Sequence, residues 1–168
     1  NTHAMNPALQ KLRYDPVTSF EPISQVGYTP TLMVVNPGVK ATQVKDLVNQ
    51  IKADPTKFSF ASAGNGTAPH FAGELFNLST KTSALHVPYK GSAPAMTDTI
   101  GGQTQIMFPS LFTALPFVKA GKVRALAVAG PARSKLLPDV PTLKEAGVEG
   151  VDVQQWYAIF APAKTPKA

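Results

Sequence analysis

Short apolar runs alternate with amphipathic segments through this chain, and this alternation limits the possible folds more than any other feature. In the segment 42–53, Val44, Leu47 and Ile51 fall at i, i+3 and i+7, the spacing of one buried helix face. Strands that alternate with helices of about ten residues are typical of a mostly parallel α/β sheet with helices on both faces. The expected strands lie at 31–36, 58–61, 85–87, 106–108 and 123–128, and the expected helices at 42–53, 69–80, 92–100 and 111–120.

The two ends of the chain predict further elements. Asn6 followed by Pro7 favours the start of a short helix, because Asn caps a helix and Pro suits its first residue. Pro30 is expected to separate a strand at 23–28 from the nearly all apolar run 31–36, which we expect to be buried on both faces. Near the C-terminus, residues 155–162 form an apolar strand with the only tryptophan.

Composition excludes several classes of protein. With 168 residues, 43% of them hydrophobic and 15% charged, the chain is expected to fold around a core rather than to be disordered. It has no cysteine, which rules out disulfides, thiolate catalysis and cysteine-ligated metal. Its apolar stretches are much shorter than the roughly 20 residues of a membrane-spanning helix. We also expect no cofactor and no metal, because the three histidines include no His-x-x-x-His pair.

The formal charge of +6 leaves two interpretations open. A basic nucleic-acid-binding module would carry its Lys and Arg along one face, whereas here they are scattered singly or in loose pairs. A solvated basic surface is therefore favoured over nucleic-acid binding.

The loop Ser62 to Thr67 is the strongest candidate for a binding site. It is made of small residues and hydroxyls, includes Gly64 and Gly66, and directly precedes a predicted helix. Backbone N–H groups and the start of a helix together suit an anion. The loop lacks the Gly-Lys-Ser/Thr of a nucleotide P-loop, and an ordinary helix-capping turn is the alternative.

Other polar residues surround this loop in the expected fold. His70 lies four residues before Glu74 and could pair with it or hydrogen-bond to a ligand, whereas His86 is expected to be a core histidine. Tyr89 follows the next strand and could reach a solute from the same edge. A serine-dependent hydrolase using Ser62 or Ser110 is a further alternative, although no Gly-x-Ser-x-Gly motif is present.

Several motifs of the chain resemble one family, in the order that family has them. They are Phe60-Ala61-Ser62-Ala63-Gly64-Asn65-Gly66-Thr67, His86-Val87-Pro88-Tyr89-Lys90-Gly91-Ser92, Gly101-Gly102-Gln103, Ala120-Gly121-Lys122-Val123-Arg124 and Leu137-Pro138-Asp139-Val140-Pro141. On these motifs the chain is similar to the periplasmic solute-binding receptors of tripartite tricarboxylate transporters, the Bug or TctC-like family. The matches extend from Asn6 to Pro166.

The resemblance implies a fold and a division of the chain. Such receptors have two α/β lobes of the type II periplasmic-binding-protein class around a cleft, and this chain covers mainly the second lobe. It implies a crossover helix and strand over 1–30, the second lobe over 31–150 and a return strand over 151–168, with the first lobe largely absent. The chain starts at Asn1 without a charged-then-apolar leader, so we expect any signal peptide to lie outside it.

The resemblance also implies a function, that of a non-enzymatic receptor in the bacterial periplasm. It would hold a small organic carboxylate between its lobes and deliver it to the membrane permease subunits of the transporter. Family members often have an acidic or amide residue where this chain has Pro109 and Ser110, which favours a carboxylate without an ammonium group. The exposed inter-lobe surface is expected to favour a homodimer or domain exchange. The candidate ligand-binding residues are Ser62, Ala63, Gly64, Gly66, Thr67, His70, Tyr89 and Ser110.

Overall fold

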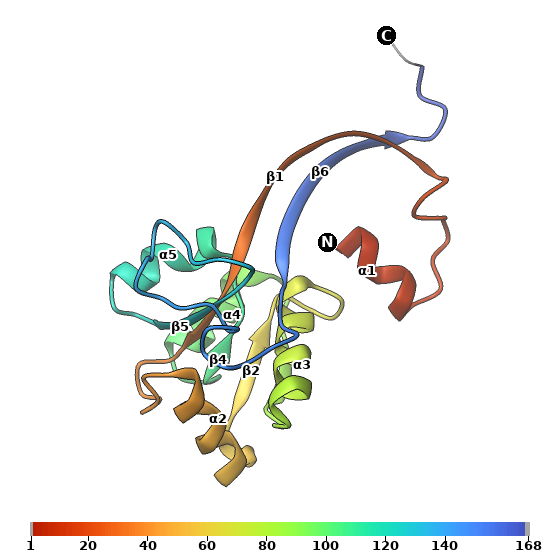
Figure 1. Cartoon of the computed structure of the whole chain (residues 1–168). Coiled ribbons are helices and arrows are strands. Elements are labelled where there is room, and N and C mark those ends of the chain that lie inside the picture. Colours follow the sequence, from red (N-terminus) through yellow and green to blue (C-terminus); the bar gives the residue numbers. More distant parts are fainter. Residues whose placement is uncertain (1, 167–168) are drawn as a thin grey trace.

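A computed structural model describes residues 2–166 as an α/β lobe from which a long two-stranded ribbon extends (Figure 1). The strand order in the sheet is β3-β2-β4-β1-β5. Because β2 is parallel to β3 and β4, and β1 is antiparallel to β4 and β5, β2 to β5 all point one way and β1 points the other. The predicted α/β class with a mostly parallel sheet is therefore confirmed. The strands are β1 (Phe20–Val35), β2 (Ser59–Ser62), β3 (Leu85–Pro88), β4 (Ile106–Met107) and β5 (Arg124–Ala129).

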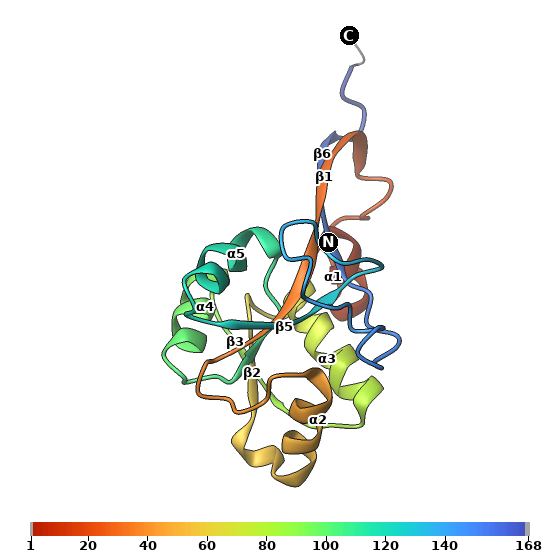
Figure 2. The ribbon, with the colours of Figure 1, turned by 60° about the vertical axis from the view of Figure 1, so that its left-hand side comes forward.

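Helices cover both faces of this sheet, as Figure 2 shows from a second direction. On one face Met33 and Val35 pack with Leu47 of α2 and Phe76 of α3. On the other face, Leu32 and Val34 pack against α4 and α5. Alternate residues of β1 thus serve opposite faces, and the four from Leu32 to Val35 are fully buried, as predicted. The helices are α2 (Val44–Ala53), η1 (Pro55–Lys57), α3 (Ala68–Thr80), α4 (Ser92–Ile100) and α5 (Leu111–Lys119).

The ribbon is formed by the first part of β1 and by β6 (Gln154–Pro162), which pair antiparallel from Phe20↔Pro162 to Pro30↔Gln154. From Thr31 onward β1 pairs instead with β5 and β4 in the main sheet. The predicted break at Pro30 is wrong, because the strand continues through this residue. The proline, which lacks an N–H, lies where the partner strand changes and therefore interrupts neither ladder in its middle.

The first helix, α1 (Thr2–Leu9), lies beside β6 under the arch of the ribbon (Figure 1). It begins before Asn6, so the predicted start is wrong, and Pro7 lies within it. The ring of His3 stacks on Phe160 of β6, with centroids 4.8 Å apart. At the other end of the helix, a Cβ on Gly66 would lie 2.9 Å from Leu9 Cδ1. Thus α1 contacts both the ribbon and the loop before α3.

None of the helices described between residues 2 and 166 is long and apolar enough to cross a bilayer.

Candidate functional site

The loop between β2 and α3 forms a compact turn that we call the cradle, residues 62–67. Thr67 Oγ1 donates to the carbonyl of Gly64 at 2.7 Å, and Gly64 N donates to Ser62 Oγ at 3.1 Å. Gly64 has a φ of +124° and Gly66 a φ of +75°, backbone conformations that side chains disfavour. The two glycines therefore set the shape of the cradle.

Two helices begin at this edge of the sheet without a side-chain cap. Thr67 precedes α3 and Gly91 precedes α4, and neither residue makes a side-chain hydrogen bond to its helix. The cradle is also bonded to the residue that precedes α4, because Gly91 N donates to Ala63 O at 3.2 Å. Uncapped helix starts present N–H groups and positive dipole ends, which favour an anion.

Beneath the cradle lies a column of stacked rings. Ser62 is fully buried, and its Oγ lies 2.7 Å from His86 Nε2. The His86 ring stacks between Phe60 and His70, with centroid separations of 4.9 and 4.1 Å. Burial, together with the neighbouring His70, lowers the pKa of His86 to about 4. His86 is half-buried and linked to the cradle, so it is more than the core histidine expected from the sequence.

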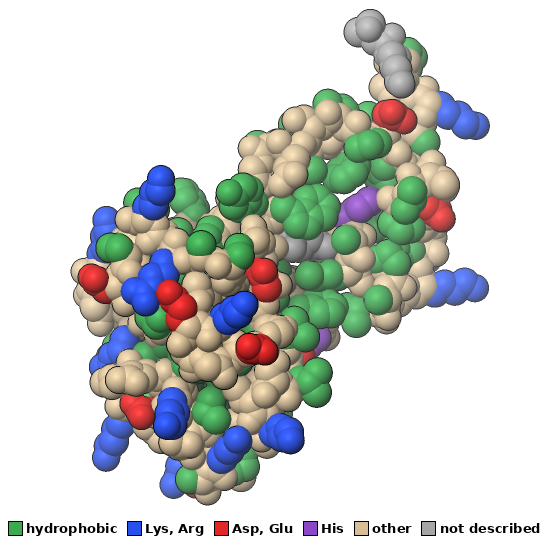
Figure 3. Space-filling model, in the orientation of Figure 1, with side chains coloured by type: hydrophobic (Ala, Val, Ile, Leu, Met, Phe, Trp, Pro, Cys, Tyr) green, Lys and Arg blue, Asp and Glu red, His purple; other side chains and the backbone are tan. Residues whose placement is uncertain are grey.

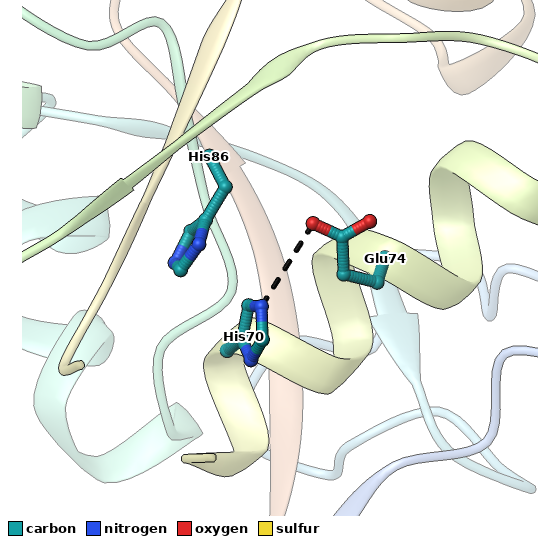
Figure 4. A group of neighbouring side chains, drawn as sticks. All are labelled: His70, Glu74 and His86. Atoms are coloured by element: carbon teal, nitrogen blue, oxygen red, sulfur yellow. Dashed lines mark ion pairs between the residues drawn. The ribbon is translucent and has the colours of Figure 1, made fainter. Parts of the chain in front are cut away.

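His70 connects the ring column to the cradle and to α3 (Figure 4). Its Nδ1 accepts a hydrogen bond from Gly66 N at 3.3 Å, and its Nε2 lies 3.9 Å from Glu74 Oε1. The pair with Glu74 that the sequence suggested is therefore present, whereas hydrogen bonding of His70 to a ligand stays a prediction.

Tyr89 supports the cradle from the end of β3. Its backbone N donates to Ser62 O at 3.0 Å, and its carbonyl would lie 3.1 Å from a Cβ on Gly64. Its hydroxyl donates to Asp98 Oδ2 at 2.8 Å, and burial together with this carboxylate raises the pKa of Tyr89 to about 12. The hydroxyl of Tyr89 therefore already donates its hydrogen within the protein.

Ser110 follows the neighbouring strand β4 and caps helix α5. Its Oγ accepts from Thr113 N at 3.1 Å and lies 2.8 Å from Thr113 Oγ1. Seven of the eight candidate residues thus lie in the cradle or contact it directly. The eighth, Ser110, uses its hydroxyl to cap a helix.

A pocket of about 440 Å³ opens between the two helix starts and the ribbon. The lobe contributes Ala63, Thr67, Ala68, Pro69 and Ser92, and the other wall consists of His3 with Gln155, Trp156, Tyr157, Ala158 and Phe160. Sequence analysis did not place His3, Gln155 or Phe160 at the site. No local signal identifies them, because Gln155 and Phe160 reach the pocket through the pairing of β1 with β6 and His3 reaches it by stacking on Phe160.

The comparisons with known proteins agree with this architecture. The profile of the tripartite tricarboxylate transporter family receptor matches residues 1–168. The chain belongs to this family. Among curated relatives of the receptor, a UPF0065 protein from the tcbD-tcbE intergenic region of Pseudomonas sp. (strain P51) is 35% identical over 159 residues, 94% of this chain and 47% of its own length. Protein BugT of Bordetella pertussis is 34% identical over 157 residues, covering 94% of this chain and 48% of BugT.

Solved structures of similar receptors superpose closely on this chain. The periplasmic binding protein BugD matches 99% of it and 56% of its own chain, with a TM-score of 0.94 and 36% identity. R. palustris Rpa4515, solved with adipate, matches with a TM-score of 0.89 and 33% identity, over 94% of this chain and 52% of its own. MatC from Rhodopseudomonas palustris with bound malate matches with a TM-score of 0.89 and 29% identity, over 98% of this chain and 55% of its own. The chain thus spans about half the length of the relatives it matches.

These findings bear on the two alternatives from the sequence. The family and its solved structures are periplasmic solute-binding receptors, not enzymes. Although Ser62 meets a histidine, its hydroxyl is fully buried, so no substrate can reach it in this structure. Lys and Arg are spread over the lobe on the face in Figure 3, without the basic stripe that nucleic-acid binding requires. Neither alternative is favoured.

Proposed function

We propose that this chain is the second lobe, with its crossover segments, of a periplasmic receptor that captures a small organic carboxylate for a tripartite membrane transporter. The observation that carries this proposal is the pocket at the two uncapped helix starts. Adipate and malate occupy two of the similar solved receptors. The crossover segments would be 1–30 and 151–168, and the lobe 31–150, which agrees with the change of partner strand at Pro30.

The chemistry of the pocket favours recognition of a carboxylate by backbone groups. Its lining holds no Lys, Arg, Asp or Glu among the described residues, so a carboxylate would meet N–H groups at the starts of α3 and α4 and the hydroxyl of Ser92. The Thr67 hydroxyl already donates to Gly64 O and acts by holding the turn. Trp156 and Phe160 offer an apolar wall for a hydrocarbon segment. The described lining offers an ammonium group no carboxylate to pair with, which supports a solute without an amino group.

The candidate residues then divide by role. The solute would meet Ala63 and Thr67, which line the pocket, whereas Gly64 and the buried Gly66 set the shape of the turn behind them. Ser62, His70, Tyr89 and Ser110 act mainly by holding that surface, because their polar groups already bond within the protein. In a complete receptor the other lobe would supply the opposite half of the cleft, so we expect this lobe alone to bind weakly.

A thermal-shift screen of C3 to C8 mono-, di- and tricarboxylates tests the proposal, because a ligand that binds only the folded state raises the melting temperature. We expect a shift with at least one dicarboxylate. It should be lost in Gly64→Ala and reduced in Thr67→Val, which removes the hydroxyl bonded to Gly64.

Thr97→Val is the matched control, since Thr97 lies exposed on α4 away from its start. This variant should keep the full shift. No shift with any carboxylate, or the same shift in Thr67→Val and Gly64→Ala as in the parent, would refute the proposed site.

A further inference from the structure

Three side chains with metal-binding atoms converge beside the cradle, and none of them lines the pocket. His70 and Glu74 lie one turn apart on α3, and His86 comes from the neighbouring strand β3 (Figure 4). One ligand atom from each residue lies within 4.8 Å of the other two. We propose that His70, Glu74 and His86 bind a divalent transition-metal ion of the zinc class.

The set of donors selects the kind of ion. Two imidazoles and one carboxylate suit Zn²⁺ and neighbouring ions such as Co²⁺ and Ni²⁺, whereas Mg²⁺ and Ca²⁺ prefer oxygen ligands. Three protein ligands leave a fourth position of a tetrahedral ion open to water or to another ligand.

The surroundings of His86 resemble those of a metal-binding histidine. Its Nε2 is bonded to Ser62 Oγ, and that hydroxyl can in turn donate to Gly64 O at 3.2 Å. In this arrangement His86 Nε2 carries the proton and Nδ1 keeps its lone pair. A metal-binding histidine commonly has such a partner for its other ring nitrogen, because the partner fixes the tautomer and the orientation of the ring.

The site is accessible, and its side chains must rearrange to hold an ion. Zn–N bonds of about 2.0–2.1 Å place two ligands of a tetrahedral ion roughly 3.4 Å apart, so the atoms that now lie within 4.8 Å must close by about 1.4 Å or less. The side chain of Glu74 is 51% exposed and that of His70 is 19% exposed. Because a metal lies in the plane of each imidazole that binds it, the His70 ring, which now stacks on His86 with centroids 4.1 Å apart, must turn out of this stack. A rotation of the half-exposed Glu74 side chain then completes the ligand set.

Metal binding changes the cradle in a way that can be measured. His70 now accepts the Gly66 N–H at Nδ1, so Nε2 carries the ring proton. To bind a metal through Nε2, which faces Glu74, the neutral ring must move its proton to Nδ1. The hydrogen bond from Gly66 is then lost, and the amide of Gly66 reports occupancy of the site.

Isothermal titration of the chelator-treated protein with ZnCl₂ tests the proposal without any carboxylate, so its failure is separable from failure of the proposed function. We expect saturable binding of one ion per chain, visible absorption from tetrahedral Co²⁺, a shift of the Gly66 amide signal, and no binding of Mg²⁺. His70→Gln and Glu74→Gln should each weaken Zn²⁺ binding by about tenfold or more.

His3→Gln is the matched control, because His3 is the one remaining histidine and lies on α1 against Phe160. This variant should bind Zn²⁺ like the parent. Glu74→Gln changes a half-exposed side chain, so it should unfold at the parent temperature without metal. Absence of binding by the parent, unchanged affinity in both site variants, or loss of affinity in His3→Gln would overturn the proposal.

Discussion

Gly73 is the position where α3 approaches the sheet most closely, and replacing it with alanine should destabilise the protein. A Cβ there would overlap the ring of Phe60, whose Cζ would be 2.6 Å away, whereas carbon atoms in contact lie about 3.5–4.0 Å apart. Phe60 is 1% exposed and stacks on His86, so its ring cannot move by about 1 Å without disturbing the column under the cradle.

The size of the effect follows from two opposing contributions. Overpacking a well-filled core costs about 1–3 kcal/mol, and here the upper end applies because ring atoms overlap directly. Replacing a helical glycine with alanine returns up to about 1 kcal/mol. The expected net loss is therefore about 2 kcal/mol in the free energy of unfolding, or roughly 4–8 °C in melting temperature for a chain of this length.

Urea and thermal unfolding followed by circular dichroism measure this loss in Gly73→Ala. Ser79→Ala is the control on the same helix, because Ser79 is exposed and the change should be neutral or slightly stabilising. In Phe60→Leu/Gly73→Ala the smaller side chain should make the combined loss less than the sum by about 1 kcal/mol. A Gly73→Ala protein as stable as the parent would refute the packing argument.

Three further predictions follow from single features. Ser110→Ala should lower the free energy of unfolding in a urea titration by about 1 kcal/mol, because it removes the cap of α5. A loss of carboxylate binding without a loss of stability would instead place Ser110 in the binding site. Arg133 and the Thr142 backbone N–H lower the pKa of Glu145 below its usual 4.5. The parent should therefore be more stable than Glu145→Gln by its full margin above pH 4.5, and this margin should vanish as the pH falls through the lowered pKa. A difference that persisted in acid would contradict that sign. The apolar side chains that the ribbon exposes are Ile23, Val26, Tyr28, Tyr157 and Ile159. They should drive self-association, so light scattering should detect dimers, and a monodisperse monomer would argue against this prediction.

Patterns local to the sequence predicted much of the fold. The apolar run Leu32–Val35 is fully buried, and the helical spacing of Val44, Leu47 and Ile51 places all three in the core. Such patterns succeed because periodicity directly reflects which side chains face inward. The small residues of 62–67 likewise indicated a turn before a helix, and the structure has α3 directly after this turn.

Features that depend on long-range pairing could not be predicted in this way. The sequence suggested a break at Pro30, but pairing with two different partner strands carries β1 through it. The contact of His86 with Ser62 and His70 arises because β2 and β3 are neighbours and α3 packs against them. The pocket wall formed by Trp156 and Phe160 requires residues from opposite ends of the chain to meet.

The proposed function rests on binding of a carboxylate at the cradle and the two helix starts. A titration of the ¹⁵N-labelled protein with adipate, followed by amide chemical shifts, tests it most directly, because this measurement detects weak binding residue by residue. We expect saturable shifts of the Gly64, Gly66, Thr67 and Ser92 amides, with smaller changes elsewhere. Unchanged signals at these four residues while others shift, or no saturable shift with adipate, malate or any other carboxylate of the panel, would contradict it.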